Sequence, residues 1–359
     1  MKKSWIGLTT ITLLLACGEA DQSDTSKTIP ENGGQAGSGN QVYYLLRGDM
    51  ADRLAADFIG YEMNDPVPCA SVYSDVKNDT KRCSYMNILD SAGVKLAYHY
   101  DDGSVGIHPG EKVSWKELWQ HTTEALGWIP YADECLKDYP LIQASQPYSG
   151  YAAALCARGL LNDKKPDDLV TLKEMSEWMI QTLLYQAGSC TRFDLIELMA
   201  AYYQDFSYDP NFVCQPLFPD VTSDMKLRCQ LTEFMVKKGL IQGLPDGKFH
   251  GENQFNMAEF MKMLVFSSKL ETSPCQTDAC DGEAPKDTWY CSYADAVCKT
   301  GVLQGSFNSA ESGHLDRYYV TIVSILLKQY LAKLTKQGDP CHCIDRKVVE
   351  VPGDFAMGR

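Results

Sequence analysis

Residues 218–264 read FPDVTSDMKLRCQLTEFMVKKGLIQGLPDGKFHGENQFNMAEFMKML, and this stretch decides the fold of the chain. Its apolar residues recur at helical spacing in two runs, at 231–240 and at 260–264. Gly239 ends the first run, where a left-handed residue costs least as glycine. Pro245-Asp246-Gly247 predicts a tight turn between two helices. The unit is therefore helix, turn-rich loop, helix, and it cannot bury its apolar faces alone.

Weaker copies of this unit recur along the chain. They span residues 44–126, 148–184 and 287–334. A longer period relates the two halves of the sequence at an offset of about 145 residues. It relates Arg47 to Arg192, Asp49 to Asp194, Cys69 to Cys214, and the turn at 73–76 to the turn at 218–221. Matches at so many landmarks predict a tandem duplication, in which neighbouring units stack to bury a common core.

The stretch resembles the S-layer homology motif of bacterial surface proteins. That motif has an aromatic-Pro-Asp-Val entry, a helix ending in Gly-Ile/Leu-Ile, a Gly-x-Pro-Asp-Gly-x-Phe loop and a Thr-Arg-Ala-Glu helix. The matching residues are Phe218-Pro219-Asp220-Val221, Gly239-Leu240-Ile241, Gly243-Leu244-Pro245-Asp246-Gly247-Lys248-Phe249 and Asn256-Met257-Ala258-Glu259. Met257 stands where the motif has its basic residue. The resemblance implies three motifs around a pseudo-threefold helical core.

The expected fold class is mainly α, with tandem helix-loop-helix, S-layer-homology-like repeats in two duplicated, disulfide-stapled lobes. The first lobe is expected at residues 42–187 and the second at residues 188–336. A polar tail at residues 337–359 follows. Its Val348-Val349-Glu350-Val351 run predicts a short strand or a segment that wraps back over a lobe.

The N-terminus is typical of an exported protein. Lys2 and Lys3 precede a short apolar run, so residues 1–16 are interpreted as a signal peptide. Leu14-Leu15-Ala16-Cys17 resembles a bacterial lipobox, which implies a lipid on Cys17 and a membrane anchor; the alternative is an ordinary signal with a chance cysteine. Gly18 follows, so a Gram-negative host would place the protein at the outer membrane. Residues 17–41 are rich in Gly, Ser, Asp and Asn, which predicts a flexible tether.

The charge balance and the motif search argue against two classes of function. The chain of 359 residues has 47 acidic and 33 basic side chains, which disfavours nucleic acid as a partner. We find no metalloprotease helix, no nucleophile elbow and no phosphate-binding glycine loop, so neither an enzyme nor a cofactor is expected. Cys341-His342-Cys343 offers either a metal ligand set or the end of a disulfide, and in an exported chain we favour the disulfide.

The cysteines follow the repeats, which indicates a structural role. Of the 14 cysteines, 13 remain after Cys17, and export places them in an oxidising compartment. The predicted pairs are Cys69–Cys83, Cys214–Cys229, Cys135–Cys156, Cys275–Cys298 and Cys280–Cys291. Cys190 is expected to pair with a tail cysteine, Cys341 or Cys343.

The resemblance also implies a function. In S-layer homology domains the basic residue of the Thr-Arg-Ala-Glu element helps to bind anionic cell-wall polysaccharide in grooves between motifs. By position, the basic residues here are Arg47, Lys116, Lys173, Arg192 and Arg317. Flat faces for sugar rings are available on Trp115, Trp119, Trp178 and Trp289. The alternative is that the basic residues form salt bridges with acids in the first turns of the helices, and that the tryptophans belong to the core.

The expected function is therefore that of a non-catalytic, lipid-anchored envelope protein that binds cell-wall glycan, either peptidoglycan or an attached polysaccharide. The alternative is a protein-interaction scaffold, at the cell surface or in the periplasm, whose partners are other envelope proteins.

Overall fold

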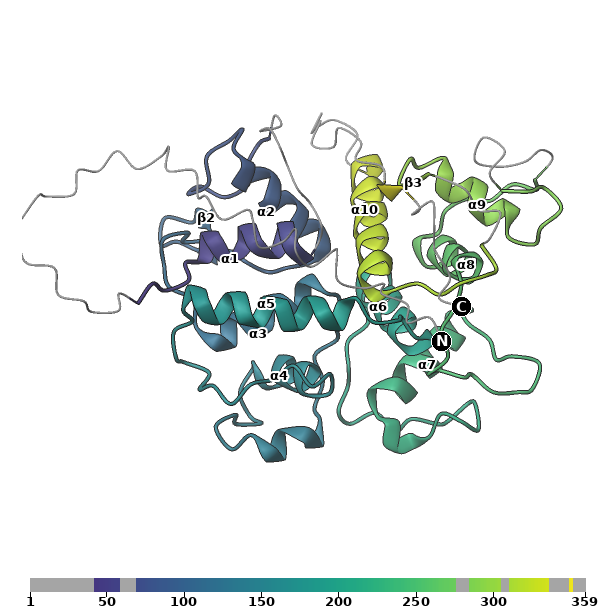
Figure 1. Cartoon of the computed structure of the whole chain (residues 1–359), viewed down its shortest axis with the longest axis horizontal. Coiled ribbons are helices and arrows are strands. Elements are labelled where there is room, and N and C mark those ends of the chain that lie inside the picture. The colour runs from purple at the N-terminus through teal and green to yellow at the C-terminus, as the bar shows by residue number, and fades with distance from the viewer. Residues whose placement is uncertain (1–41, 59–68, 276–283, 305–309, 336–348, 351–359) are drawn as a thin grey trace, which may run out of the picture. The chain divides into compact units, whose positions relative to one another are not determined.

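The computed structural model describes residues 42–58, 69–275, 284–304, 310–335 and 349–350. The chain divides into two units, residues 1–41 and 42–359, and the first lies wholly outside the described residues. The described α-helices are α1 (Arg47–Arg53), α2 (Lys81–Ala92), α3 (Trp115–Ala125), α4 (Ser149–Cys156), α5 (Leu172–Gln186), α6 (Arg192–Tyr203), α7 (Leu227–Lys237), α8 (Met257–Ser268), α9 (Cys291–Cys298) and α10 (Arg317–Thr335) (Figure 1).

Short elements complete the described structure. A π-helical turn (Leu54–Phe58) follows α1, and two 3₁₀ turns lie at Glu134–Asp138 and Ser223–Met225. The strands are β1 (Tyr98–His99), β2 (Val105–Gly106), β3 (Leu303–Gln304) and β4 (Val349–Glu350). β1 pairs with β2 antiparallel, and β3 pairs with β4 parallel. The predicted mainly α fold class is confirmed.

Four helices begin with a capping box. The caps of α3, α5, α6 and α8 are Ser114, Thr171, Thr191 and Asn256, and each forms a capping box with the acid three residues later. Such a box satisfies backbone N–H groups that a helix N-terminus otherwise leaves free. The acid also lies at the positive end of the helix dipole. These are helices that the Thr-Arg-Ala-Glu element predicts.

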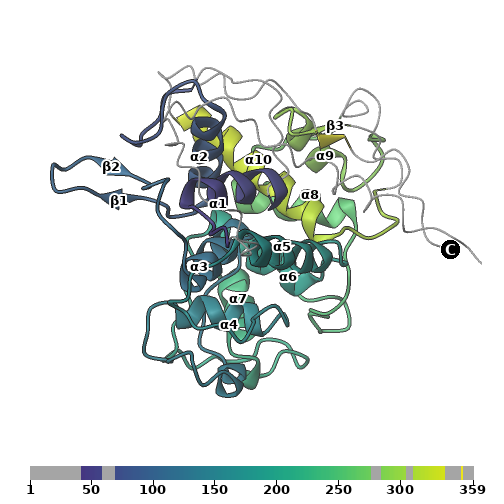
Figure 2. The ribbon, with the colours of Figure 1, turned by 60° about the vertical axis from the view of Figure 1, so that its left-hand side comes forward.

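In the first half, residues 42–187, three residues that each precede a helix cap form a closed ring of backbone hydrogen bonds. Leu45 N–H donates to Val170 O at 2.8 Å, Val170 N–H donates to Val113 O at 2.9 Å, and Val113 N–H donates to Leu45 O at 3.0 Å. All three side chains are fully buried. In the second half, residues 188–336, Cys190 takes the place of Leu45 and donates to Leu315 O at 2.8 Å. The ring brings the starts of α1, α3 and α5 together (Figure 2).

The entry turns hold the following loops by the same contact in both halves. Asp75 accepts hydrogen bonds from two successive backbone N–H groups, the second being that of His108 at 2.7 Å. Asp220 accepts the equivalent pair, the second from His250 at 2.6 Å. Both histidines have positive φ, at 52° and 54°, which is costly for a residue with a side chain. A tandem duplication predicts such matching contacts, while the lobe boundary after residue 187 stays a prediction.

α10 packs against elements of both halves. It contacts α6 and α8 in the second half, and α2 and α5 in the first. Beside it, the Tyr202 hydroxyl donates to Ala125 O at 3.0 Å, and Arg158 pairs with Glu197 at 2.7 Å, with both of these charged side chains at most 10% exposed. The buried apolar side chains of the two halves form one core cluster. None of the helices in the described ranges combines the length and the apolarity that crossing a membrane requires.

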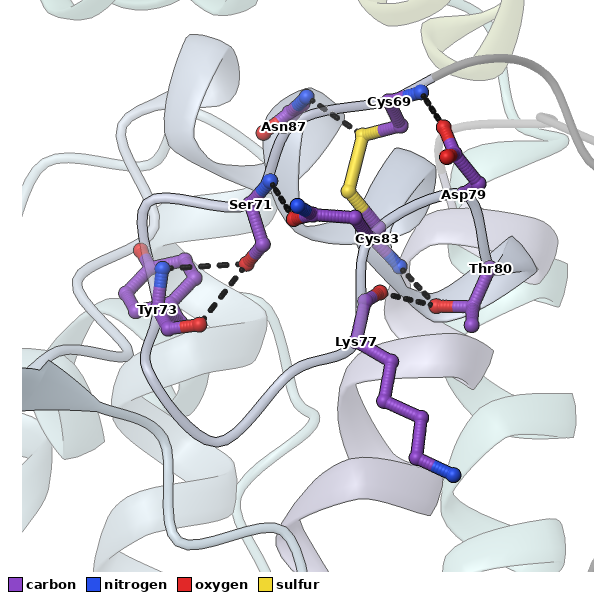
Figure 3. The surroundings of a disulfide bond; sticks show 9 residues. Cys69, Ser71, Tyr73, Lys77, Asp79, Thr80, Cys83 and Asn87 are labelled. Carbon is purple, nitrogen blue, oxygen red and sulfur yellow. Dashed lines mark hydrogen bonds between the residues drawn. A yellow bond between two sulfur atoms is a disulfide. The ribbon is translucent and has the colours of Figure 1, made fainter.

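Three of the predicted disulfides are confirmed. They are Cys69–Cys83, Cys135–Cys156 and Cys214–Cys229, with Cα–Cα distances of 6.2, 6.2 and 6.0 Å. Figure 3 shows the first of them, which joins the entry turn to α2. Here Thr80 caps α2 by accepting from Cys83 N–H at 3.2 Å, and Asp79 accepts from Cys69 N–H at 2.7 Å. The staple and the helix cap therefore support each other.

The remaining cysteine predictions need correction. Cys275 pairs with Cys291 at a Cα–Cα distance of 6.1 Å, so the predicted pairs Cys275–Cys298 and Cys280–Cys291 are wrong. Cys291 and Cys298 stand at opposite ends of α9, and Cys275 reaches the beginning of that helix instead of its end. Cys298 is itself disulfide-bonded. Cys190 is a free cysteine buried in the core, so its predicted pairing with Cys341 or Cys343 is wrong.

Several predictions fall on residues outside the described ones. These are the signal peptide at 1–16, the lipidation of Cys17, the tether at 17–41, Cys280, and the tail cysteines Cys341 and Cys343. One part of the tail is described. Val349 and Glu350 form β4, which lies beside Leu303 and Gln304 in parallel register, so the predicted short strand after residue 347 is confirmed.

Candidate functional site

A groove of about 690 Å³ opens in the second half, and we call it the second-half groove. Its walls are α6, the loop between α7 and α8, α8 itself, and the beginning of α9 with the residues just before it. Ligand pockets in proteins commonly measure roughly 300–1,000 Å³, so the groove has the size of a binding site. The polar and aromatic residues that line it include Arg192, Phe249, Glu259, Lys262, Trp289 and Tyr293.

The glycines of the loop between α7 and α8 shape one wall of the groove. A Cβ atom on Gly243 would lie 2.6 Å from the ring of Phe218, so a side chain does not fit there. Gly247 has a φ of 78°, in the left-handed region, and closes a turn in which Leu244 N–H donates to Lys248 O at 2.8 Å. The loop therefore folds back tightly, and the Gly-x-Pro-Asp-Gly pattern is its cause.

Arg192 lies in the wall of the groove with an incompletely compensated charge. It holds the first position of α6, and its side chain is 17% exposed. Nη1 is 3.4 Å from Glu259 Oε1, a long hydrogen bond, and Nε has no hydrogen-bond partner among the described residues. Burial lowers the pKa of Arg192, and the charges of Glu259 and Asp220 only partly oppose this. The guanidinium therefore gains from a further anion.

Aromatic side chains form the rim of the groove. Trp289 is 48% exposed, and its indole nitrogen donates to Glu311. The ammonium group of Lys262 lies 6.0 Å from the centre of the Trp289 ring, and Tyr293 meets that ring edge-on at 6.3 Å. Phe266 is also exposed on this rim. Flat apolar faces beside a cation suit the faces of a sugar ring and an acidic substituent.

The arginines at the first positions of α1, α6 and α10 reach a neighbouring helix. Each contacts the acid in the first turn of that neighbour. The contacts are Arg47 to Glu117 at 2.7 Å, Arg192 to Glu259 at 3.4 Å, and Arg317 to Asp194 at 3.1 Å. The predicted alternative, salt bridges at helix N-termini, is therefore observed. Each salt bridge joins two different helices. Arg317 also donates to Tyr185 O at 3.2 Å and does not line the second-half groove.

Arg47 differs from Arg192 although it holds the equivalent position. Its guanidinium contacts Glu117 twice, at 3.0 and 2.7 Å, and Glu111 at 2.5 Å. The ring of Tyr98 covers it at 4.2 Å. Burial lowers the pKa of Arg47, but hydrogen bonding to Glu117, with the further effects of Tyr98 and Glu111, raises it above its ordinary value. Arg47 is therefore fully compensated.

The two predicted lysines lie one position later in their helices than the arginines do. Ser114 and Thr171 are the caps of α3 and α5, so Lys116 and Lys173 hold the second helical position. Lys116 pairs with Asp167 at 2.5 Å, and Lys173 is 85% exposed on α5. Neither lysine lines the second-half groove.

The predicted tryptophans divide into core and surface. Trp115 and Trp119 are at most 2% exposed, so they cannot present an open face to a sugar, and their assignment to a glycan site is corrected. Trp115 packs edge-on against Trp178, which is also buried. Trp289 alone of these four is exposed, at the rim of the groove.

Sequence reasoning missed Lys262, Phe266 and Tyr293 as groove residues. Lys262 and Phe266 lie four residues apart on α8, which places them on one face of the helix. The sequence shows the apolar, core-facing row of α8 clearly. Lys262 and Phe266 form another row on the same helix, and their spacing of four residues could have identified them as a pair that faces the groove. In the part of the chain that the structure describes, no three His, Cys, Asp or Glu side chains gather in a metal-binding arrangement.

Comparison with known proteins connects a third of the chain to S-layer proteins. Over 125 residues the chain is 30% identical to the S-layer protein sap of Bacillus anthracis, and equally to an S-layer protein of Bacillus thuringiensis subsp. finitimus. The match covers 34% of this chain and 15% of each relative, so the chain spans a small part of the relatives' length. No protein-family model matches. This partial similarity to S-layer proteins is compatible with an exported protein of the cell envelope.

Proposed function

We propose that this chain is a non-catalytic envelope protein that holds cell-wall glycan, either peptidoglycan or an attached polysaccharide, in the second-half groove. The observation that carries the proposal is Arg192, a guanidinium in an open groove with one long hydrogen bond and a lowered pKa. An acidic group of a glycan would supply the missing counter-charge. Arginine suits this role because its planar fork binds a carboxylate or phosphate with two parallel hydrogen bonds.

The aromatic rim adds contacts to the sugar rings themselves. Trp289 offers an exposed face beside Lys262, so a ring can stack on the indole while its acidic substituent points toward the cations. The chain as a whole carries a net charge of −14, which repels an anionic polymer at long range. Binding therefore depends on this local positive site.

We place the folded part on a lipid anchor. In this proposal the lipid is attached to Cys17, residues 17–41 are the tether, and the outer membrane is the destination in a Gram-negative host. The S-layer similarity supports export and a position in the envelope. Two S-layer-homology-like lobes, residues 42–187 and 188–336, would then link the membrane to the wall.

A protein-interaction scaffold is the second candidate, and one observation favours it. Leu172, Ile180 and Leu184 lie along one row of α5, spaced by multiples of four residues, and all three are exposed. An apolar row on a helix can receive another protein. In this case the partners would be other envelope proteins, and the groove would not bind the wall.

Cosedimentation with purified sacculi separates the two candidates. Wild-type protein should pellet with the sacculi, and Arg192→Gln should remain in the supernatant, since glutamine keeps the packing but loses the charge. Arg228→Gln is the matched control, because Arg228 is an exposed arginine of α7 that does not line the groove. Equal pelleting of all three proteins contradicts the role of Arg192. No pelleting of wild type favours the scaffold.

A further inference from the structure

We infer that the first half holds a second groove of the same kind, and that the chain occupies it with two of its own side chains, Tyr98 and Glu111. This inference rests on the proposed function of the second-half groove. Tyr98 stands where a sugar ring would lie, and Glu111 stands where its acidic group would lie. The first-half groove is thus a latent binding site.

The backbone establishes which residues correspond. Arg47 N–H donates to Glu111 O at 2.9 Å, and Arg192 N–H donates to Asn253 O at the same distance. The N–H groups of Glu111 and Asn253 in turn donate, both at 3.0 Å, to the carbonyls of the two positive-φ histidines. Glu111 and Asn253 therefore hold the same place in the fold, and the exchange of an acid for a neutral amide is a real difference between the halves.

That exchange decides the state of each arginine. Glu111 brings its carboxylate to 2.5 Å from Arg47 Nη1, as an acidic ligand would. Asn253 carries no charge, so the only acid that Arg192 contacts among the described residues is Glu259, at 3.4 Å, while the ring of Phe249 lies 5.0 Å from its Cζ. The carboxylate of Glu111 is itself 57% exposed, so it occupies the mouth of the site and is not part of the core.

The second occupant reaches the site because its hairpin is longer. Tyr100 N–H donates to Ser104 O at 2.9 Å, in the same turn that Leu244 and Lys248 close in the second half. Seven positions separate Gly93 from Tyr100, while only five separate Gly239 from Leu244. (Both glycines are the left-handed residues that end α2 and α7.) The segment after the turn, which leads to His108, is also longer than its counterpart before His250. The added residues on the two sides of the turn pair as β1 and β2.

The extra length places Tyr98 over the ion pair. Its ring lies 4.2 Å from Arg47 Cζ, and its hydroxyl donates to Glu117 Oε1 at 3.1 Å. Burial raises the pKa of Tyr98, as does the charge of Glu117, to about 12, so the hydroxyl stays protonated and remains a donor. Arg192 also has a ring beside it, that of Phe249 at 5.0 Å, but Tyr98 lies closer to its arginine and adds a hydroxyl on the acid, as a bound sugar would. A wall ligand must displace both Tyr98 and Glu111 to bind here.

Titration calorimetry tests the inference with wall fragments solubilised by muramidase that retain their attached polysaccharide. Wild type should bind with one site. The double variant Tyr98→Ser/Glu111→Asn should bind with two, and adding Arg47→Gln should return it to one. The reverse exchange, Asn253→Glu, should supply Arg192 with an internal acid and weaken wild-type binding at least tenfold. A folded double variant that still shows one site overturns the inference.

A second readout separates this inference from the proposed function. Phenylglyoxal modifies accessible arginines, and mass spectrometry can follow Arg47 without any wall ligand. Arg47 should be protected in wild type and become at least several-fold more reactive in the double variant. Unchanged reactivity of Arg47 overturns the latent groove even if wild type binds the wall. Increased reactivity of Arg47 with no binding by either protein supports an occupied groove and refutes glycan as its ligand.

Discussion

The Asp220→Asn substitution should lower the free energy of unfolding by about 1–2 kcal/mol. Asp220 accepts two backbone hydrogen bonds, at 2.9 Å from Phe249 and at 2.6 Å from His250. A hydrogen bond to a charged group contributes roughly 1.5–3 kcal/mol. Asparagine keeps one acceptor oxygen and loses the charge, and the carboxylate is only partly buried, so solvent screening reduces the expected loss.

Urea unfolding followed by circular dichroism measures this change. Asp224→Asn is the matched control, because Asp224 is exposed and its contact is with nearby Thr222. The control should leave the unfolding midpoint at that of wild type, because a substitution at an exposed site without a packed contact changes stability little. Asp220→Asn should also weaken wall binding, since Phe249 lies in the groove wall. An unfolding midpoint equal to that of wild type would refute the reasoning about the entry turn.

The loss should depend on pH in a defined direction. Burial raises the pKa of Asp220, but the backbone N–H groups of Phe249 and His250 outweigh it, so the pKa lies below its ordinary value. Such a carboxyl stabilises the folded state above its unfolded pKa of about 3.9, and this stabilisation disappears as the pH falls through the folded value. The difference between wild type and Asp220→Asn should therefore be complete near about pH 6 and vanish toward about pH 2.

Three other variants probe a disulfide, a buried ion pair and the rim of the groove. Replacing Cys69 and Cys83 with serine should lower the free energy of unfolding, measured in urea, by roughly 3 kcal/mol, because the disulfide no longer closes a loop of about 15 residues in the unfolded chain. An unchanged free energy would show that this disulfide does not constrain the unfolded chain. Glu197→Gln should lower the free energy of unfolding by roughly 3 kcal/mol, because it leaves the buried charge of Arg158 without its carboxylate partner. An unchanged free energy of unfolding would contradict this ion pair. Trp289→Ala should weaken wall binding about threefold to tenfold at unchanged stability, as expected for loss of one aromatic stacking contact; full binding would remove Trp289 from the site.

The repeat could be predicted because it leaves local traces in the sequence. Cysteines that flank an entry turn recur about 145 residues apart, and both Cys69–Cys83 and Cys214–Cys229 form. The repeat did not predict the pairing at α9, where Cys275 bonds to Cys291. An eight-residue helix carries a cysteine at each end, and the pattern does not tell which end Cys275 reaches.

The helical positions of Lys116 and Lys173 could have been predicted from nearby residues. Ser114 and Glu117 are three residues apart and form a capping box, and this spacing places Trp115 at the first helical position. The predicted Lys116 therefore had to lie at the second. The difference between the two grooves had no such local sign. It depends on Glu111 and Tyr98 meeting Arg47 across the fold, and such contacts between distant residues follow only from the packed structure.

A crystal structure of the complex with a wall fragment would show whether the second-half groove is the binding site. We expect an acidic group of the fragment within hydrogen-bonding distance of the Arg192 guanidinium, and a sugar ring against Trp289. A fragment bound on the exposed face of α5 or elsewhere, with the second-half groove vacant, would contradict this expectation.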